Sequence, residues 1–137
     1  MIVICGGGTG GHLAIARSFC EELNRRDIKP IFIGSTSGQD KFWFENDENF
    51  LQKFFLPSSG VVNKRGFAKL KSLTNIVNLA LKCRKIFKQN GIKAVISVGG
   101  YSAAPAAIAA IISKVPLFIH EQNAVMGKLN KILRPYA

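Results

Sequence analysis

Short apolar runs alternate along the chain with longer segments in which apolar residues recur at a helical spacing. Five runs have the length and composition of buried strands: residues 1–5, 30–33, 51–56, 93–98 and 115–119. Helices are predicted between and after them, at residues 13–26, 40–46, 67–89, 103–113 and 126–134. Residues 58–66 are predicted to form a loop. In the longest helix, the apolar residues expected to share one stripe are Leu70, Leu73, Val77, Leu81 and Phe87.

The alternation of strand and helix predicts the fold. Strands that are separated by helices and joined by short connections form a parallel sheet with helices on both faces. The expected class is therefore α/β, a doubly wound, Rossmann-like sheet in a single domain of 137 residues. Such sheets bind ligands beyond the carboxyl ends of their strands. The segments that directly follow the strands are therefore the candidate site: residues 6–12, 99–105 and 120–123.

Composition narrows the class of protein. Apolar residues make up 47% and charged residues 20% of the chain, which fits a globular core and not a disordered segment. The three cysteines are odd in number and lack C-x-x-C spacing, so we expect a reducing compartment. We find no signal-peptide pattern and no apolar run long enough to span a membrane. These features predict a cytosolic, soluble chain.

Charge is distributed unevenly along the sequence. Nineteen Lys and Arg against eight Asp and Glu give a net charge of +11, and residues 50–119 contain eleven basic residues and no acidic one. A surface of this kind attracts an anionic partner: nucleic acid, phospholipid headgroups or a phosphorylated substrate. A solvated basic face without a partner is the alternative reading, and charge alone does not decide between them.

The first glycine-rich loop, residues 6–12, follows the first predicted strand. Gly6, Gly8 and Gly11 form a G-x-G-x-x-G pattern, in which backbone N–H groups can approach a phosphate at a helix N-terminus. A dinucleotide site would also need an acid at the end of the second strand, and none occurs there before Asp40. A P-loop would need Lys after the last glycine, where His12 stands. The loop therefore predicts phosphate binding of another type, with a purely structural turn as the alternative.

A second glycine-rich loop, residues 99–105, follows the fourth predicted strand and opens another helix. Two such loops at the carboxyl ends of parallel strands predict a shared cradle for a diphosphate. Tyr101 either faces that ligand or packs beneath the loop.

A run of four polar residues, His-Glu-Gln-Asn at positions 120–123, follows the fifth predicted strand. Glu121 is the only acid after residue 48, so it is either a structural partner or a functional group. The chain has only two histidines, His12 and His120, and no carboxylate cluster accompanies them. We therefore predict no metal site.

The order of the motifs GGGTGGH, GGYSAAP and HEQN resembles the amino-terminal domain of the MurG family of glycosyltransferases, and the resemblance covers the whole chain. It implies that residues 1–137 are the acceptor-binding half of a two-domain GT-B enzyme, whose carboxyl-terminal, donor-binding domain is absent from this sequence. It also implies transfer of N-acetylglucosamine from UDP-GlcNAc to undecaprenyl-diphospho-muramoylpentapeptide (lipid I). The product is lipid II for peptidoglycan, formed with inversion and without a cofactor or D-x-D metal motif.

The resemblance assigns roles to individual residues. His12 matches a candidate general base for the acceptor hydroxyl, and Glu121 matches a neighbouring acid in the cleft. Both are therefore predicted to be catalytic, and the sequence leaves open which of the two accepts the proton. The expected donor- and acceptor-binding residues are Thr9, Gly10, Gly11, Gly99, Gly100, Tyr101 and Asn123. The isolated domain is expected to have little or no turnover.

The lipid-linked acceptor of that family suggests a partner for the basic stretch. Lys64, Arg65 and Phe67 are candidate contacts with the anionic surface of the bacterial inner membrane, on its cytoplasmic face. Two other functions remain as alternatives: an NAD-dependent oxidoreductase domain, and a basic module that binds nucleic acid or membranes without catalysis. Under the glycosyltransferase reading, no nucleic-acid partner is expected.

Overall fold

The computed structural model describes residues 1–58 and 65–137. The strands are β1 (Ile2–Cys5), β2 (Ile31–Ser35), β3 (Gln52–Leu56), β4 (Ala94–Ser97) and β5 (Leu117–Ile119). The helices are α1 (Gly10–Arg25), α2 (Asp40–Phe44), α3 (Gly66–Asn90), α4 (Ala104–Ile112) and α5 (Lys128–Leu133). Short 3₁₀ turns span Tyr101–Ala103 and Arg134–Tyr136.

The five strands form one parallel sheet in the order β3-β2-β1-β4-β5. The central strand, β1, pairs with β2 on one side and β4 on the other, with Cys5 opposite both Ile33 and Ser97. The chain therefore reverses its direction of progression across the sheet next to β1, where ligands bind in doubly wound folds. The predicted fold class is confirmed.

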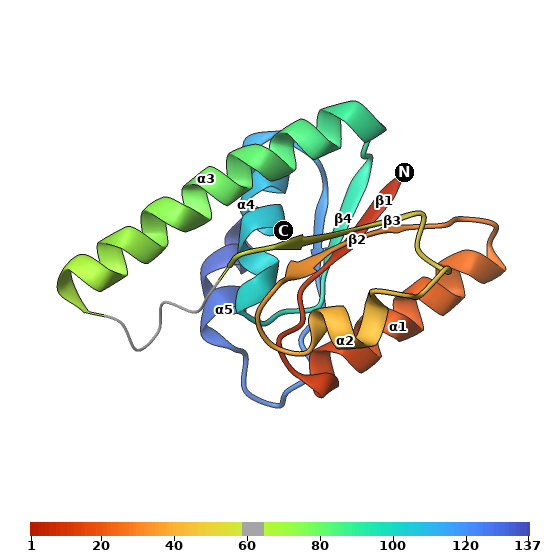
Figure 1. The fold of residues 1–137 in the computed structure, drawn as a ribbon, viewed down its shortest axis with the longest axis horizontal. Helices are drawn as coiled ribbons and strands as arrows, with labels where there is room; N and C mark the ends of the chain where they lie inside the picture. The colour runs from red at the N-terminus through yellow and green to blue at the C-terminus, as the bar shows by residue number, and fades with distance from the viewer. Residues whose placement is uncertain (59–64) are drawn as a thin grey trace.

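The helices lie on both faces of the sheet (Figure 1). Because side chains alternate along a strand, β1 sends Ile4 toward α1 and α2, and Val3 and Cys5 toward α3 and α4. The α1–α2 side contains a cluster of aromatic rings around the fully buried Phe32. The opposite side is aliphatic, and the small residues of α4 allow it to pack closely against α3.

Four of the five residues of the predicted α3 stripe face solvent and do not pack against the core. Only Phe87 is buried, whereas Leu70, Leu73, Val77 and Leu81 are exposed. The residues of α3 that face the protein are Ser72, Ile76, Leu79, Ala80, Cys83, Ile86 and Phe87. The helix carries apolar residues on two sides, so periodicity alone could not identify the side that packs. Figure 1 shows its amino-terminal half projecting beyond the sheet.

Helix α1 begins at Gly10, three residues before the predicted start. The last glycines of the first loop therefore form the first turn of the helix. This shift places the helix N-terminus inside the candidate site.

Candidate functional site

The two glycine-rich loops contact each other at the carboxyl ends of β1 and β4. The Gly7 N–H donates to the Gly99 carbonyl oxygen at 3.1 Å. A side chain at Gly6 would collide with the Gly99 carbonyl oxygen, and one at Gly100 with the Gly7 carbonyl oxygen. Both glycines also have positive φ angles, 112° and 80°. Glycine is therefore required at this junction, and the predicted meeting of the two loops at one edge of the sheet is confirmed.

Asp40 fixes the first loop from below. Its side chain is fully buried and accepts a hydrogen bond from the Gly8 N–H at 2.6 Å and from the Ser35 N–H at 2.7 Å. Sequence reasoning examined Asp40 only as a possible ribose ligand. Because both carboxylate oxygens bind backbone amides, this acid is not available to a ribose hydroxyl. The oxidoreductase alternative is therefore left without the acid that it would use to bind the ribose.

The amides available to an anion differ from those that the glycine pattern suggests. The Gly6 N–H donates to the Ile33 carbonyl oxygen, and the N–H groups of Gly7 and Gly8 are occupied as described above. The first backbone hydrogen bond of α1 runs from the Leu13 N–H to the Thr9 carbonyl oxygen. The amides of residues 10–12 precede it and point out of the helix N-terminus. This first turn, and not the preceding glycines, is therefore the part of the first loop whose amides remain free for an anion.

Tyr101 covers the first loop from the second. Its ring packs where a side chain on Gly8 would lie, with Cε1 2.8 Å from that Cβ position, and its hydroxyl lies 3.2 Å from Ser37 Oγ. The ring is half-buried. The sequence allowed Tyr101 either to face a ligand or to pack against a loop, and the geometry favours packing against the loop. The neighbouring Ser102 Oγ is buried and has no hydrogen-bond partner among the described residues.

The His12 side chain lies at the loop junction. Nδ1 is 2.9 Å from Thr9 Oγ1, and the Nε2 edge of the ring lies 3.3 Å from the position of a Cβ on Gly99. Burial lowers the pKa of His12 below its ordinary value of 6.5, and the negative charges of Glu121 and Asp40 oppose that shift. His12 is therefore held largely neutral near pH 7, which is the form that accepts a proton.

Glu121 organises the loop that follows β5. One carboxylate oxygen accepts hydrogen bonds from the backbone and side-chain N–H groups of Asn123, at 3.1 and 3.3 Å. The other accepts from the Gly127 N–H at 2.8 Å and from Asn130 Nδ2 at 2.9 Å. These donors, Gly127 first and Asn130 second, lower the pKa of Glu121. The carboxylate is thus ionised and occupied by its own loop.

Asn130 is a site residue that sequence reasoning missed. It is 3% exposed, and its Nδ2 lies 3.5 Å from the Cβ position of Gly99, on the same glycine that His12 contacts. Its Oδ1 is buried and has no hydrogen-bond partner among the described residues. The only signal was an asparagine in a short helix, four residues before an expected end, which does not distinguish it from a surface residue.

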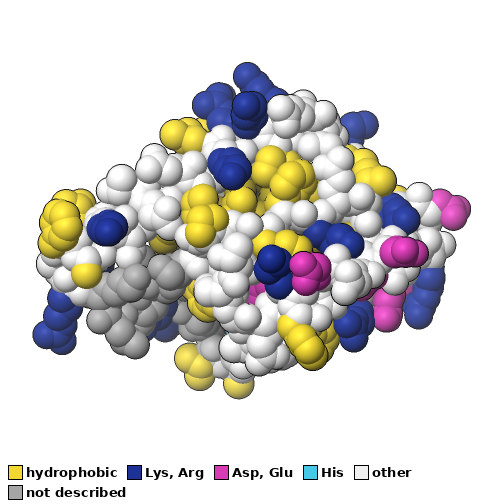
Figure 2. Space-filling model, viewed as in Figure 1, with side chains coloured by type: hydrophobic (Ala, Val, Ile, Leu, Met, Phe, Trp, Pro, Cys, Tyr) yellow, Lys and Arg dark blue, Asp and Glu magenta, His cyan; other side chains and the backbone are white. Residues whose placement is uncertain are grey.

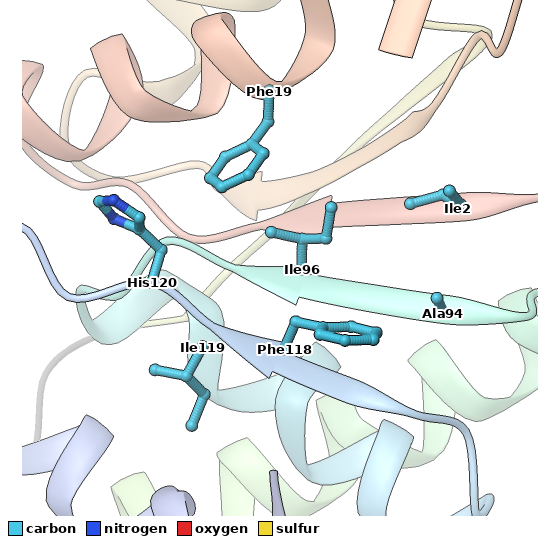
Figure 3. A pocket seen from close by; sticks show the side chains of 7 residues that line it. All are labelled: Ile2, Phe19, Ala94, Ile96, Phe118, Ile119 and His120. Carbon is cyan, nitrogen blue, oxygen red and sulfur yellow. The ribbon is translucent and has the colours of Figure 1, made fainter. Parts of the chain in front are cut away.

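The other members of the His-Glu-Gln-Asn run point in different directions. Gln122 lies across Gly11, with Nε2 3.1 Å from the Cβ position there, and Asn123 is exposed. His120 packs edge-on against Phe19 in an apolar pocket of about 390 Å³, which residues of β4 and β5 also line (Figure 3). In residues 1–58 and 65–137, no three His, Cys, Asp or Glu side chains cluster as metal ligands would. That the reaction needs no metal stays a prediction.

The remaining predicted contact residues fall into two groups. Gly10 and Gly11 lie in the first turn of α1, and Gly10 faces Trp43 at 3.4 Å from its Cβ position. Arg65 and Phe67 lie at the start of α3, away from the loops, and Phe67 is 81% exposed. Lys64 lies outside the described residues.

Comparison with known proteins identifies the family. Residues 2–137 match the Glycosyltransferase family 28 N-terminal domain. A curated relative from Campylobacter hominis is 59% identical over 99% of this chain and 40% of its own length, and one from Campylobacter fetus subsp. fetus is 60% identical over 99% and 41%. Both are named UDP-N-acetylglucosamine–N-acetylmuramyl-(pentapeptide) pyrophosphoryl-undecaprenol N-acetylglucosamine transferase.

A solved structure agrees with these relatives. The crystal structure of Acinetobacter baumannii MurG superposes with a TM-score of 0.85 at 26% identity, over 99% of this chain and 39% of that one. The predicted resemblance and the amino-terminal half of a GT-B fold are thereby confirmed. The chain spans about 40% of the length of the curated relatives it matches. The chain belongs to glycosyltransferase family 28, and residues 2–137 match the amino-terminal domain of that family.

Proposed function

We propose that this chain is the acceptor-binding half of an inverting N-acetylglucosaminyltransferase that converts lipid I to lipid II. The donor would be UDP-GlcNAc, bound largely by a second domain, and the acceptor a lipid-linked diphosphate. The observation that carries the proposal is the direct contact between the two glycine-rich loops, with His12 above it. The names of the relatives supply the identity of the two substrates.

The loop junction suits a substrate that combines a diphosphate with a reacting hydroxyl. The free amides at the N-terminus of α1 and the basic character of the chain favour an anion. Beside them, neutral His12 would accept the proton of the acceptor hydroxyl as that oxygen attacks the anomeric carbon and UDP departs. Glu121, the other catalytic candidate from the sequence, would not accept the proton. Since four donors surround its carboxylate, we assign it to holding Asn123 and α5 in place.

A longer protein that includes this domain tests the proposal. UDP release should require both UDP-GlcNAc and a lipid-linked diphosphate acceptor, and residues 1–137 alone should give no turnover because the donor would be bound largely by the second domain. A coupled assay of UDP formation, with and without acceptor, measures this. UDP release that is independent of the acceptor would contradict the assignment of these loops to acceptor binding.

The membrane surface is the second proposed partner, and helix α3 supplies the contact. We define the α3 apolar stripe as the exposed residues Phe67, Leu70, Leu73, Val77 and Leu81, which are 43–81% exposed. The nearby cations Arg65, Lys69 and Lys71 are exposed as well. Figure 2 shows hydrophobic and basic side chains over α3, whereas the acidic ones gather on the opposite side of this view. No helix in the described part of the chain is long and apolar enough to cross a bilayer. We therefore propose peripheral attachment on the cytoplasmic face.

Vesicle binding tests the α3 apolar stripe. The double variant Phe67→Ser/Leu70→Ser should partition onto anionic phosphatidylglycerol vesicles at least about 10-fold more weakly than the wild type, because two exposed apolar side chains are lost. The matched control is Phe42→Ser: Phe42 is 90% exposed but lies on α2 near acidic residues, so its loss should leave binding unchanged. Co-sedimentation measures both variants. Equal weakening by the control would show that the stripe is not the membrane contact.

A further inference from the structure

Thr9 stands at the N-cap position of α1 without capping the helix. Its backbone is extended, with φ −123° and ψ 158°, as at an N-cap, yet its side chain makes no hydrogen bond to a helix amide. The hydroxyl instead lies 2.9 Å from Nδ1 of His12. A residue type that stabilises a helix start is thus used to contact an imidazole.

The two nitrogens of His12 lie in different surroundings. Nδ1 faces Thr9 Oγ1, and Nε2 faces Gly99 of the second loop, 3.3 Å from its Cβ position. No residue in the described ranges, 1–58 and 65–137, forms a hydrogen bond with Nε2. The Thr9 hydroxyl can accept a hydrogen bond from an Nδ1–H group or donate one to an unprotonated Nδ1, so this contact by itself fits both neutral tautomers. A ring that takes a proton at the loop junction must, however, leave Nε2 unprotonated, and its single hydrogen then lies on Nδ1, within hydrogen-bond distance of Thr9 Oγ1.

We propose that Thr9 is a positioning residue that holds neutral His12 as its Nδ1–H tautomer, leaving the lone pair on Nε2 at the loop junction. This inference rests on the proposed transferase function. The proton of the acceptor hydroxyl passes to Nε2 while the acceptor oxygen forms its bond to the anomeric carbon. The bond from that carbon to the UDP oxygen breaks, and its electron pair leaves with UDP. The imidazolium keeps its Nδ1–H bond to Thr9 and releases the other proton to water.

The charged groups around the ring are consistent with this arrangement. Glu121, from the loop after β5, and Asp40, from α2, both favour the imidazolium that forms during the reaction. Burial outweighs them in the resting state and lowers the pKa of His12. At neutral pH the ring is therefore mostly neutral, and which nitrogen holds the single hydrogen becomes a question that experiment can answer.

Nuclear magnetic resonance of this chain tests the tautomer without any assay of activity. With ¹⁵N-labelled histidine, only the side chains of His12 and His120 give ring-nitrogen signals. The signals that disappear in His12→Gln are those of His12. We expect a protonated Nδ1 and an unprotonated Nε2 in the wild type and in Thr9→Ser. In Thr9→Val, which has nearly the same shape but lacks the hydroxyl, this preference should disappear. A wild-type ring protonated on Nε2, or an unchanged tautomer in Thr9→Val, would overturn the proposal.

Kinetics of the longer enzyme separate positioning from substrate binding. Thr9→Val should lower kcat about 10-fold with KM within twofold, because a misaligned base slows the chemical step. Thr9→Ser should restore most of kcat. A raised KM with unchanged kcat would instead make Thr9 a substrate contact and overturn its positioning role. If the enzyme proves not to be a transferase, the proposed function fails, but the resonance result still decides the tautomer.

Discussion

Replacing His12 with alanine in the longer enzyme is expected to lower kcat by roughly 10²- to 10⁴-fold, the range that a positioned general base contributes. The expectation follows from three features of the ring: its place above Gly99, its lowered pKa, and an Nε2 with no partner in the described part of the chain. KM for the acceptor should change little if the ring acts mainly in the transition state. Steady-state UDP release at saturating donor, with varied acceptor, measures both constants.

His120→Ala is the matched control, since it removes the other histidine of the chain. His120 lines the apolar pocket beside Phe19 (Figure 3), where its ring packs edge-on against that phenyl ring, so kcat should stay within about threefold of the wild type. Wild-type turnover by His12→Ala would remove the general-base assignment and leave substrate positioning and electrostatics to account for the rate.

The pH dependence of kcat/KM tests the general-base role of His12 independently. A general base works in its deprotonated form, so activity falls as pH decreases through the pKa of His12. Because burial holds that pKa below 6.5, the acid limb of kcat/KM should have its midpoint below pH 6.5. In His12→Ala this limb should be absent from the residual activity.

The sequence predicts the positions of the strands and loops because local rules govern them. Apolar runs ended by glycine are characteristic of buried parallel strands, and the doubly wound fold then brings the segments after β1, β4 and β5 to one edge. The contact between Gly7 and Gly99 is therefore implied by topology, although the hydrogen bond itself is seen only in the structure.

What the sequence does not predict depends on tertiary contacts. Asp40 resembles a surface acid until the fold buries it against Gly8 and Ser35, and Asn130 becomes a site residue only because α5 packs beside Gly99. For a similar reason, the sequence alone does not show which side of α3 is exposed. Both of its sides are apolar, and only the position of α4 decides which side is buried.

A single methyl group added at the loop junction is expected to lower the free energy of unfolding strongly. Gly100→Ala should destabilise the domain by roughly 3–5 kcal/mol, because two costs combine at this position. With φ 80° and ψ 162°, Gly100 occupies a backbone region that only glycine adopts readily. In addition, its new Cβ would collide with the Gly7 carbonyl oxygen, which belongs to backbone and cannot rotate away. Urea unfolding, followed by circular dichroism, measures the free energy of unfolding.

Gly91→Ala separates the two costs. Gly91 ends α3 with φ 58° and ψ 50°, and no atom lies within 4 Å of its Cβ position, so alanine meets backbone strain without a collision. Its cost should be about 1 kcal/mol. The excess at Gly100 then measures how tightly the second glycine loop is held against the first. Equal losses for the two variants would mean that the loops are loosely joined in solution, and a cradle of fixed amides for a diphosphate could not be maintained there.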